Sequence, residues 1–375
     1  VKAIDAELGT FTLTGNVANF AQQYKITIDA GDFALTGNNA TLEHNEAITA
    51  ETGAFSFTGN AATLAKAAAP KIIAADTGTF ALTGGAPSLS VGHYLDPATG
   101  SFSLTGNAAG LAKAERLAAD TGTFALNGQQ ATLRQDYRLT ADTGTFAATG
   151  QPATLRHAPR IEAIAGLFAL VGNPATTRHG YAIAAEAGTF SAAGQPATLR
   201  HNPKVLGATG TFALSGQQAT LLKDYRLTAE TGTFTFTGQP ATLRHNPKIE
   251  AATGTFALTG GAPALLRGRY LSGGSGEFIE TGQPATFRRT WAIRPTAGAF
   301  ALTGITPALT EIGAYEIDPI VGSFTLTGQS AQLAQSQTLP VDAGTFVLSG
   351  GTADIRHNVR IDGDTGGFSL TGNAA

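Results

Sequence analysis

The sequence contains no cysteine and no methionine, and it has only one tryptophan among 375 residues. Without cysteine, disulfide bonds and zinc sites built on thiolates are excluded. Charged residues make up only 14% of the chain, and the formal net charge is -3. Lys and Arg form no long runs, so we expect no nucleic-acid partner.

Long apolar runs are also missing. No stretch approaches eighteen consecutive apolar residues, so we expect no membrane insertion. The apolar residues are spread evenly along the chain, which predicts a single continuous β-repeat array over residues 1–375 with no separate globular domain. Because the chain begins with Val1 and contains no methionine, we interpret it as a processed protein or a segment of a longer one.

The dominant feature is a repeat of 22 residues, written about seventeen times. Each copy has a Gly, a Phe two residues later, and a second Gly four residues after the Phe. A fixed period of this kind predicts an array of units that are each too small to bury their own apolar face. The Phe column consists of Phe11, Phe33, Phe55, Phe80, Phe102, Phe124, Phe146, Phe168, Phe190, Phe212, Phe234, Phe256, Phe278, Phe300, Phe324, Phe346 and Phe368.

Alternation of apolar and polar residues predicts three short β-strands in each copy. In the copy that begins at Gly232, the first strand contains Phe234 and Phe236, the second contains Leu243, and the third contains Ile249. No helical periodicity is present. We expect the structural core to be formed by columns that include Phe33, Leu35, Gly37, Phe124, Leu126, Gly128, Phe212, Leu214, Gly216, Phe256, Leu258 and Gly260.

Two all-β architectures fit this elongated repeat array. In a β-solenoid, each copy is one coil that pairs in parallel with its neighbours. In a stacked β-hairpin fibre, Gly-Asn or Gly-Gln would be the centre of a type II′ turn, which would place Phe212 opposite Leu221. Tyr recurs in every second copy from Tyr94 to Tyr315, which indicates either duplication of a pair of repeats or units that face opposite sides of the fibre. The second explanation would suit alternating hairpins better than uniform coils. Of the two architectures, we favour the solenoid.

An acidic residue stands two positions before the first Gly in ten copies. Stacked carboxylates could hold Ca²⁺ between coils, but the calcium-binding pattern Gly-Gly-x-Gly-x-Asp is missing. We therefore predict turn and solubility roles and no cofactor, with Ca²⁺ at the acidic column as the alternative. The column consists of Glu7, Asp29, Glu51, Asp76, Asp120, Asp142, Glu186, Glu230, Asp342 and Asp364.

Asn or Gln follows the second Gly in most copies, as at Asn38 and Gln151. The amides could form a hydrogen-bonded ladder along the stack. The alternative is that Asn simply suits a turn at this position.

The candidate surface-binding residues are Arg-His pairs that occupy one position in consecutive copies. If the copies stack, they form a basic stripe that could contact an anionic polysaccharide; the alternative is a solvated edge. The stripe consists of Arg156, His157, Arg178, His179, Arg200 and His201.

One copy departs from the pattern, with Glu277 and Glu280 in its first strand and the single Trp291 further on. We take Trp291 as a further candidate for a specialised contact. Because no set of nucleophile, base and orienting residue interrupts the repeats, we expect no enzymatic activity.

The string Gly-Thr-Phe-Ala-Leu-Thr-Gly at Gly254, and its close variant at Gly122, resembles repeats in tail-fibre-like and other surface proteins of bacteriophages and prophages, notably of alphaproteobacteria. The resemblance implies an elongated extracellular or virion-surface fibre. We therefore expect a structural fibre shaft that associates with itself end to end. Lateral association is expected through the small residues of the first strand, such as Ala34 and Ser56. The alternative is a glycan- or surface-binding adhesin that uses the Arg-His stripe and the Tyr edge.

Overall fold

The computed structural model describes most of the chain, and the described residues form two compact units. Unit 1 comprises Val1–Ile183 with Gly188–Ala193, and unit 2 comprises Ala184–Ala187 with Gly194–Ala375. Continuity of one array across the whole chain stays a prediction. The described ranges are 2–20, 24–43, 47–65, 71–90, 93–96, 98–112, 116–134, 138–156, 160–178, 182–200, 204–222, 226–244, 248–266, 269–283, 286–288, 291–295, 297–305, 307–310, 315–317, 322–334, 337–340, 343–356, 359–362 and 366–372.

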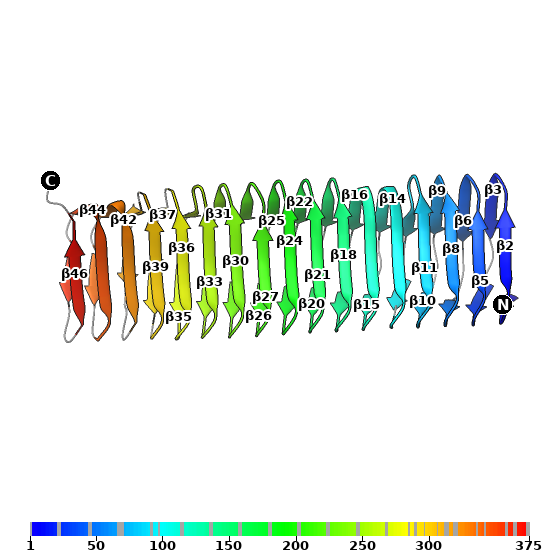
Figure 1. The fold of residues 1–375 in the computed structure, drawn as a ribbon, viewed down its shortest axis with the longest axis horizontal. Helices are drawn as coiled ribbons and strands as arrows, with labels where there is room; N and C mark the ends of the chain where they lie inside the picture. The colour runs from blue at the N-terminus through cyan, green and yellow to red at the C-terminus, as the bar shows by residue number, and fades with distance from the viewer. Residues whose placement is uncertain are drawn as a thin grey trace. The chain divides into compact units, whose positions relative to one another are not determined.

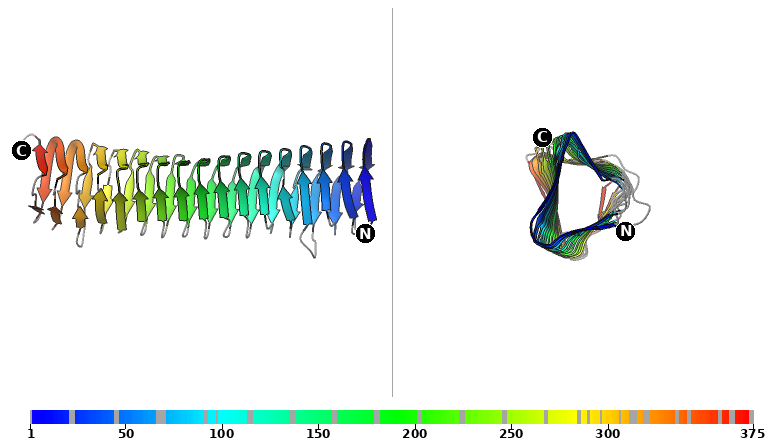
Figure 2. Two further views of the ribbon diagram at one scale, coloured as in Figure 1. Left: turned by 90° about the horizontal axis from the view of Figure 1, so that it is seen from below. Right: turned by 90° about the vertical axis from the view of Figure 1, so that its right-hand side faces the viewer.

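Each unit is a parallel β-solenoid whose coils contain a first, a second and a third strand (Figure 1). Within each unit, the described strands pair in parallel with the equivalent strands of neighbouring coils, as Phe102 does with Phe124 and Leu117 with Leu139. The first and second strands belong to one sheet and the third strand to another. Seen end-on, the coils of unit 1 trace a three-sided outline (Figure 2). The predicted all-β fold and the solenoid architecture are confirmed.

The strands of unit 1 divide by their place in the coil. The first strands are β2 (Thr10–Thr14), β5 (Asp32–Thr36), β8 (Ala54–Gly59), β11 (Thr79–Gly84), β18 (Thr145–Gly150), β21 (Leu167–Gly172) and β24 (Thr189–Gly194). The second strands are β3 (Val17–Phe20), β6 (Asn39–Glu43), β9 (Ala61–Ala65), β12 (Ser88–Ser90), β19 (Ala153–Arg156) and β22 (Ala175–Arg178). First and second strands are continuous in β14 (Ser101–Ala112) and β16 (Thr123–Arg134). The third strands are β1 (Lys2–Ala6), β4 (Tyr24–Ile28), β7 (Ala47–Ala50), β10 (Lys71–Ala75), β13 (His93–Asp96), β15 (Arg116–Ala119), β17 (Arg138–Ala141) and β20 (Arg160–Ala163), followed by β23 (Ala182–Ala185), which lies at the division between the units.

The strands of unit 2 follow the same plan. Its first strands are β27 (Thr211–Ser215), β30 (Thr233–Gly238), β33 (Thr255–Gly260), β36 (Glu277–Gly282), β39 (Ala299–Gly304) and β46 (Gly367–Thr371). Its second strands are β25 (Ala197–Arg200), β28 (Ala219–Leu222), β31 (Ala241–Arg244), β34 (Ala264–Leu266), β37 (Thr286–Arg288) and β40 (Ala308–Thr310). The two are continuous in β42 (Ser323–Ala334) and β44 (Thr345–Arg356). Its third strands are β26 (Lys204–Gly207), β29 (Arg226–Ala229), β32 (Lys248–Ala251), β35 (Arg269–Gly273), β38 (Trp291–Pro295), β41 (Tyr315–Ile317), β43 (Gln337–Pro340) and β45 (Val359–Asp362).

The hairpin alternative is wrong. Phe212 pairs with Phe234 and Leu221 pairs with Leu243, so both partners lie one repeat away instead of across a tight turn. The physical reason is that the second Gly bends the strand around a corner without reversing it. In β16 the strand continues through Gly128 as far as Arg134.

The core of unit 1 is organised around a continuous stack of Phe rings. Phe33, Phe55 and Phe80 are buried, and their ring centroids lie 4.8–4.9 Å apart with the rings nearly parallel. This distance equals the spacing between neighbouring strands, about 4.8 Å, so in-register pairing alone brings each ring onto the next. Leu side chains two residues further along, such as Leu35 and Leu82, are fully buried beside them.

The stack tilts in unit 2 where a second Phe enters the core. Phe236 stands where most coils have Leu, and the ring of Phe234 is inclined 37° to that of Phe212. A Cβ at Gly207 would lie 3.4–3.6 Å from ring carbons of Phe234, which is ordinary van der Waals contact. The coil of Phe55 and Phe57 in unit 1 also buries two rings, and there Phe55 stays nearly parallel to Phe33 and Phe80.

Both Gly columns are explained by close approach of backbones from successive coils. A Cβ on Gly37 would collide with the carbonyl oxygen of Gly15, and a Cβ on Gly53 with that of Gly31. Among the described glycines only Gly9 has a positive φ, of 128°. The repeated Gly is therefore required by the space between coils and not by a left-handed turn conformation.

Candidate functional site

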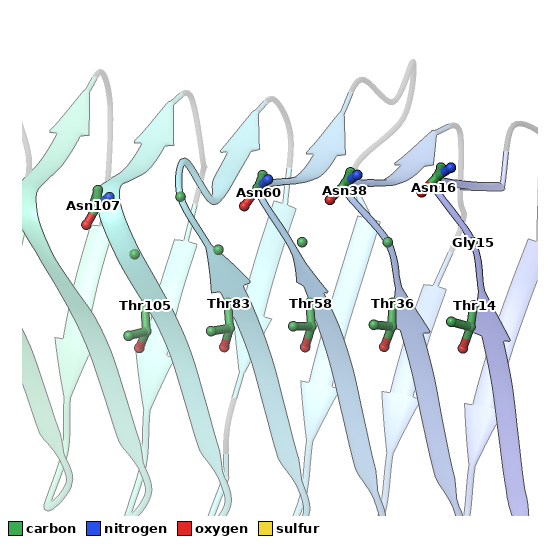
Figure 3. A pocket seen from close by; sticks show the side chains of 15 residues that line it. Thr14, Gly15, Asn16, Thr36, Asn38, Thr58, Asn60, Thr83, Thr105 and Asn107 are labelled. Carbon is green, nitrogen blue, oxygen red and sulfur yellow. The ribbon is translucent and has the colours of Figure 1, made fainter.

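A polar groove runs across the first-strand corner of unit 1, perpendicular to the strands. It has a volume of about 780 Å³. Figure 3 shows a row of Thr side chains on one side, a row of Asn side chains on the other, and glycine between them. Its lining residues are Thr14, Gly15, Asn16, Thr36, Gly37, Asn38, Thr58, Gly59, Asn60, Thr83, Gly84, Gly85, Thr105, Gly106 and Asn107.

The repeat itself builds this groove. Thr36 follows the buried Leu35 on its strand and therefore points outward, and Asn38 begins the bend after Gly37. Since a Cβ at Gly37 would meet the preceding coil, the glycine row stays empty and forms the floor. The Thr row was not predicted as part of a site, although it has a sequence signal, a Thr that recurs three residues after the Phe in most copies.

No charged side chain lines the groove, whose Thr residues recur in each coil while Gly85 replaces Asn in one of them. Backbone N–H groups donate to the carbonyls of Asn16, Asn38 and Asn60 over 2.9–3.1 Å, so these backbones link coil to coil while the side chains face outward. The predicted amide ladder stays a prediction. In the equivalent column of unit 2, the hydroxyls of Thr327 and Ser349 lie 3.1 Å apart, which shows that side-chain hydroxyls can connect successive coils.

The acidic column lies at the corner between the third and first strands. The carbonyl of Asp29 accepts hydrogen bonds from both the N–H and the Oγ1 of Thr52, at 2.8 and 2.7 Å. Asp120 and Thr143 repeat the arrangement. The backbone carbonyls of these acidic residues therefore link one coil to the next, and their carboxylates lie at the surface.

Metal binding at this column finds no geometric support in the described ranges. No group of three or more His, Cys, Asp or Glu residues there could hold a metal ion. The predicted positions Asp342 and Asp364 lie outside the described residues. Ca²⁺ at the acidic column stays an untested alternative.

The predicted Arg stripe is brought into register in unit 1. Arg156 pairs with Arg178 on the neighbouring strand, and both side chains are exposed. Arg134, which the Arg-His pattern did not include, pairs with Arg156 and extends the row. Arg200 is exposed at the same position of a coil in unit 2.

The remaining predicted binding residues are only partly placed. His157, His179 and His201 lie outside the described residues. Trp291 begins strand β38 and pairs with Arg269. Of the two unusual carboxylates, Glu277 is exposed, whereas Glu280 is fully buried between Leu258 and Leu302 of the adjacent coils.

Ion pairs connect neighbouring third strands at the basic side of the coil. In unit 1, Glu162 pairs with both Arg138 and Arg160. Four repeats further on, Glu250 pairs with Arg226 at 3.3 Å and with Lys248 at 2.7 Å. A hydrogen bond from Lys248 and its positive charge, with the charge of Arg226, lower the pKa of Glu250 despite partial desolvation.

This ion pair predicts a pH-dependent contribution to stability. A carboxyl whose pKa is lower in the folded state stabilises the fold above its unfolded value near 4.5 and loses this effect as pH falls through the folded value. We expect Glu250→Gln to reduce the protection of β29 and β32 from hydrogen exchange slightly at pH 7 and not at pH 3. The same loss at both pH values would contradict the ion-pair origin.

Among the described residues, no helix is long and apolar enough to span a membrane. No protein-family model, curated protein or solved structure matches the chain.

Proposed function

We propose that this chain is a structural segment of a fibre, at the cell exterior or on a virion surface, and that it acts as a stiff spacer without enzymatic activity. One observation carries the proposal: within each unit, every described coil pairs in register with the next through the same columns of residues. Bending between two successive coils would disrupt three strand ladders, the stacked core and the close glycine contacts, so each unit should be stiff.

A spacer has a length that depends on the number of its repeats. Each added coil should lengthen the particle by about 4.8 Å. We propose to insert four or eight further copies of the repeat and to measure particle length by cryo-electron microscopy. Lengthening by roughly 19 and 38 Å supports the proposal. Unchanged length, or a collapsed particle, overturns it.

End-to-end joining is part of the proposal, because unpaired strand edges template further pairing. In the same images, filaments longer than one chain would identify such joining. Single particles at all concentrations would exclude it and leave the spacer role to segments that follow one another within one chain.

A second candidate function is binding of a neutral surface glycan, and the Thr–Gly–Asn groove favours it. The groove offers a Thr hydroxyl in each of its coils, and a side-chain amide in each coil except that of Gly85. Thr36→Val with Thr58→Val should abolish retention on a glycan array, whereas Thr211→Val with Thr233→Val, on first strands of unit 2, should not. Retention by all variants, or by none including the parent chain, excludes glycan binding in the groove.

A further inference from the structure

The outward side of the first strands in unit 1 carries almost no charge. These strands lie side by side (Figure 1), and their buried residues alternate with residues that face outward. Among the described residues of these strands only Asp32 is charged, and the aromatic side chains belong to the inward columns. Every Lys and Arg of the chain lies outside the first strands.

Five successive coils, from β8 to β18, form a continuous part of this side. The three outward positions of each first strand carry Thr, Ser or Ala, with Asn127 at one position, and all are exposed or half-buried. The coil before them contains Asp32, and the coil after them has the exposed Leu167 and Val171. We call these fifteen residues the hydroxyl face: Ala54, Ser56, Thr58, Thr79, Ala81, Thr83, Ser101, Ser103, Thr105, Thr123, Ala125, Asn127, Thr145, Ala147 and Thr149.

Strand pairing fixes the spacing of the hydroxyl face. Thr83 pairs with Thr58 on one side and with Thr105 on the other, so these side chains repeat about every 4.8 Å along the stack. Across the face, alternate residues of one strand lie about 6.6 Å apart. Figure 3 shows Thr58, Thr83 and Thr105 in the same orientation, with each hydroxyl and each methyl group pointing the same way. Because Thr is restricted at χ1, the hydroxyl positions are set before any ligand binds.

Successive coils of the hydroxyl face also have nearly the same orientation. Neighbouring strands of a sheet are normally rotated by about 20–25°. From Phe33 to Phe168, the planes of successive rings under the face differ by only 1–7°. Flat sheets are typically stabilised by stacking, and the Phe column supplies such a stack. The outward hydroxyl groups therefore form a regular lattice in two dimensions.

The lattice of the hydroxyl face is close to that of crystalline water. In a tetrahedral network with O–H···O distances of about 2.75 Å, second-neighbour oxygens lie roughly 4.5 Å apart and two puckered layers are roughly 7.3 Å thick. The intervals of the face differ from these by roughly 0.3 and 0.7 Å. Along five coils the first difference adds up to roughly 1.2 Å, about a quarter of one interval, so all five coils can contact one crystal plane.

We propose that the hydroxyl face binds the surface of ice, so that its ligand is water in crystalline form. Each Thr or Ser hydroxyl can both donate and accept a hydrogen bond, as a lattice water does. Ser103 and Thr105, whose hydroxyl oxygens lie 3.1 Å apart, keep further capacity for such bonds. The methyl groups of Thr and Ala lie between the hydroxyls and do not compete for hydrogen bonds.

The composition of the hydroxyl face favours ice over other ligands. A polyanion would need cations, and the face has none among its fifteen positions. Protein interfaces are enriched in aromatic residues, Met and Arg, none of which occurs on the face, so a second copy of the chain is a poorer fit. Ice binding goes beyond the proposed fibre and does not depend on it, because a spacer needs no hydroxyl lattice.

Lysines in the middle column test ice binding. Ala81→Lys with Ala125→Lys places two cations at the centre of the hydroxyl face. The matched control, Ser88→Lys with Thr132→Lys, places the same charges in the same two coils on the second strands, and all four positions are half-buried. The measurement is thermal hysteresis of a single ice crystal, together with partition of the protein into slowly growing ice.

We expect the parent and the control to produce thermal hysteresis and to be enriched in the ice. The variant with lysines on the face should need about tenfold more protein for the same effect, because a charged side chain must lose its water at the crystal surface. Thr79→Tyr with Thr123→Tyr is the second variant. Both Thr side chains are exposed, so Tyr fits without entering the core and holds the face away from a crystal plane. Hydrogen exchange of β14 and β16 shows that each variant is folded.

Three outcomes overturn the proposal. The first is exclusion of the parent protein from growing ice, without thermal hysteresis. The second is an equal loss of activity in the control and in the variant with lysines on the face. The third is a parent that sediments as pairs which the Thr79→Tyr and Thr123→Tyr substitutions separate, because a second copy would then occupy the face. Particle length and glycan retention report separately on the two proposed functions.

Discussion

Replacing Phe124 with Ala should remove about 3–5 kcal/mol from the free energy that holds its coil in the stack. The Phe124 side chain is 2% exposed, and its ring centroid lies 4.9 Å from that of Phe102 and 4.7 Å from that of Phe146. The substitution removes contacts with both neighbours and leaves a cavity between two coils that backbone pairing holds apart. Because the backbone spacing is fixed by the strand ladders, the cavity cannot collapse and the cost should fall at the upper end of this range.

The loss should be local, because each coil contacts only its neighbours. Native-state hydrogen exchange is therefore the measurement, with faster exchange expected in β14, β16 and β18 and little change in β2 or β5. Thr123→Ala is the matched control, since Thr123 is exposed on the same strand and should change stability by no more than about 0.5 kcal/mol. Equal loss of protection in both variants would show that the strand ladders and not the Phe stack hold the coils together.

The repeating core could be predicted from the sequence because its columns obey two simple rules at once. Residues alternate in and out along each strand, and the same residue type returns after 22 residues. Phe33, Leu35, Phe124 and Leu126 satisfy both rules and are buried. The three strands of the copy at Gly232 were also predicted, and they correspond to β30, β31 and β32.

Strand pairing could not be decided from the sequence. A Gly-Asn pair suits both a tight hairpin turn and a bend between two sides of a coil, and period-two alternation is the same in either case. What distinguishes them is whether Phe212 pairs nine residues or one repeat away, which is a long-range contact. Tyr94, one of the recurring Tyr residues, pairs in parallel with Arg116 of the next coil. The recurring Tyr residues therefore do not mark hairpins that face opposite sides.

A candidate site could be predicted from the sequence where a single position of the repeat supplies all of its residues. The Arg stripe is one column, and stacking brings Arg156 and Arg178 together as expected. The groove needs two columns separated by glycine, so it depends on how the bend after the first strand arranges both columns. Glu280 was recognised as unusual, and its burial follows from the same alternation, because it stands two residues after Phe278 in the column that Leu35 occupies.

Glu280 gives the second large expected effect: Glu280→Leu should raise the free energy of unfolding by about 1–4 kcal/mol. The Glu280 side chain is fully buried in a column where the adjacent coils have Leu258 and Leu302. Removing a carboxyl group from water is costly, and an apolar side chain of similar volume that matches its neighbours avoids that cost. Because both flanking positions already accommodate Leu, the substitution should fit without strain.

Chemical denaturation followed through exchange of β33, β36 and β39 amides measures this gain. Glu277→Thr is the control, since Glu277 is exposed on the same strand and its neighbour Thr255 already carries the replacement. A stabilised Glu280→Leu variant would show that the carboxyl is kept at the expense of stability. Local departures from the packing rules occur mainly at functional sites, so the search for an activity beyond stacking would then begin at this coil. A destabilised variant would instead show that the interactions of the carboxyl outweigh its desolvation and that this coil is held by polar contacts its neighbours do not have.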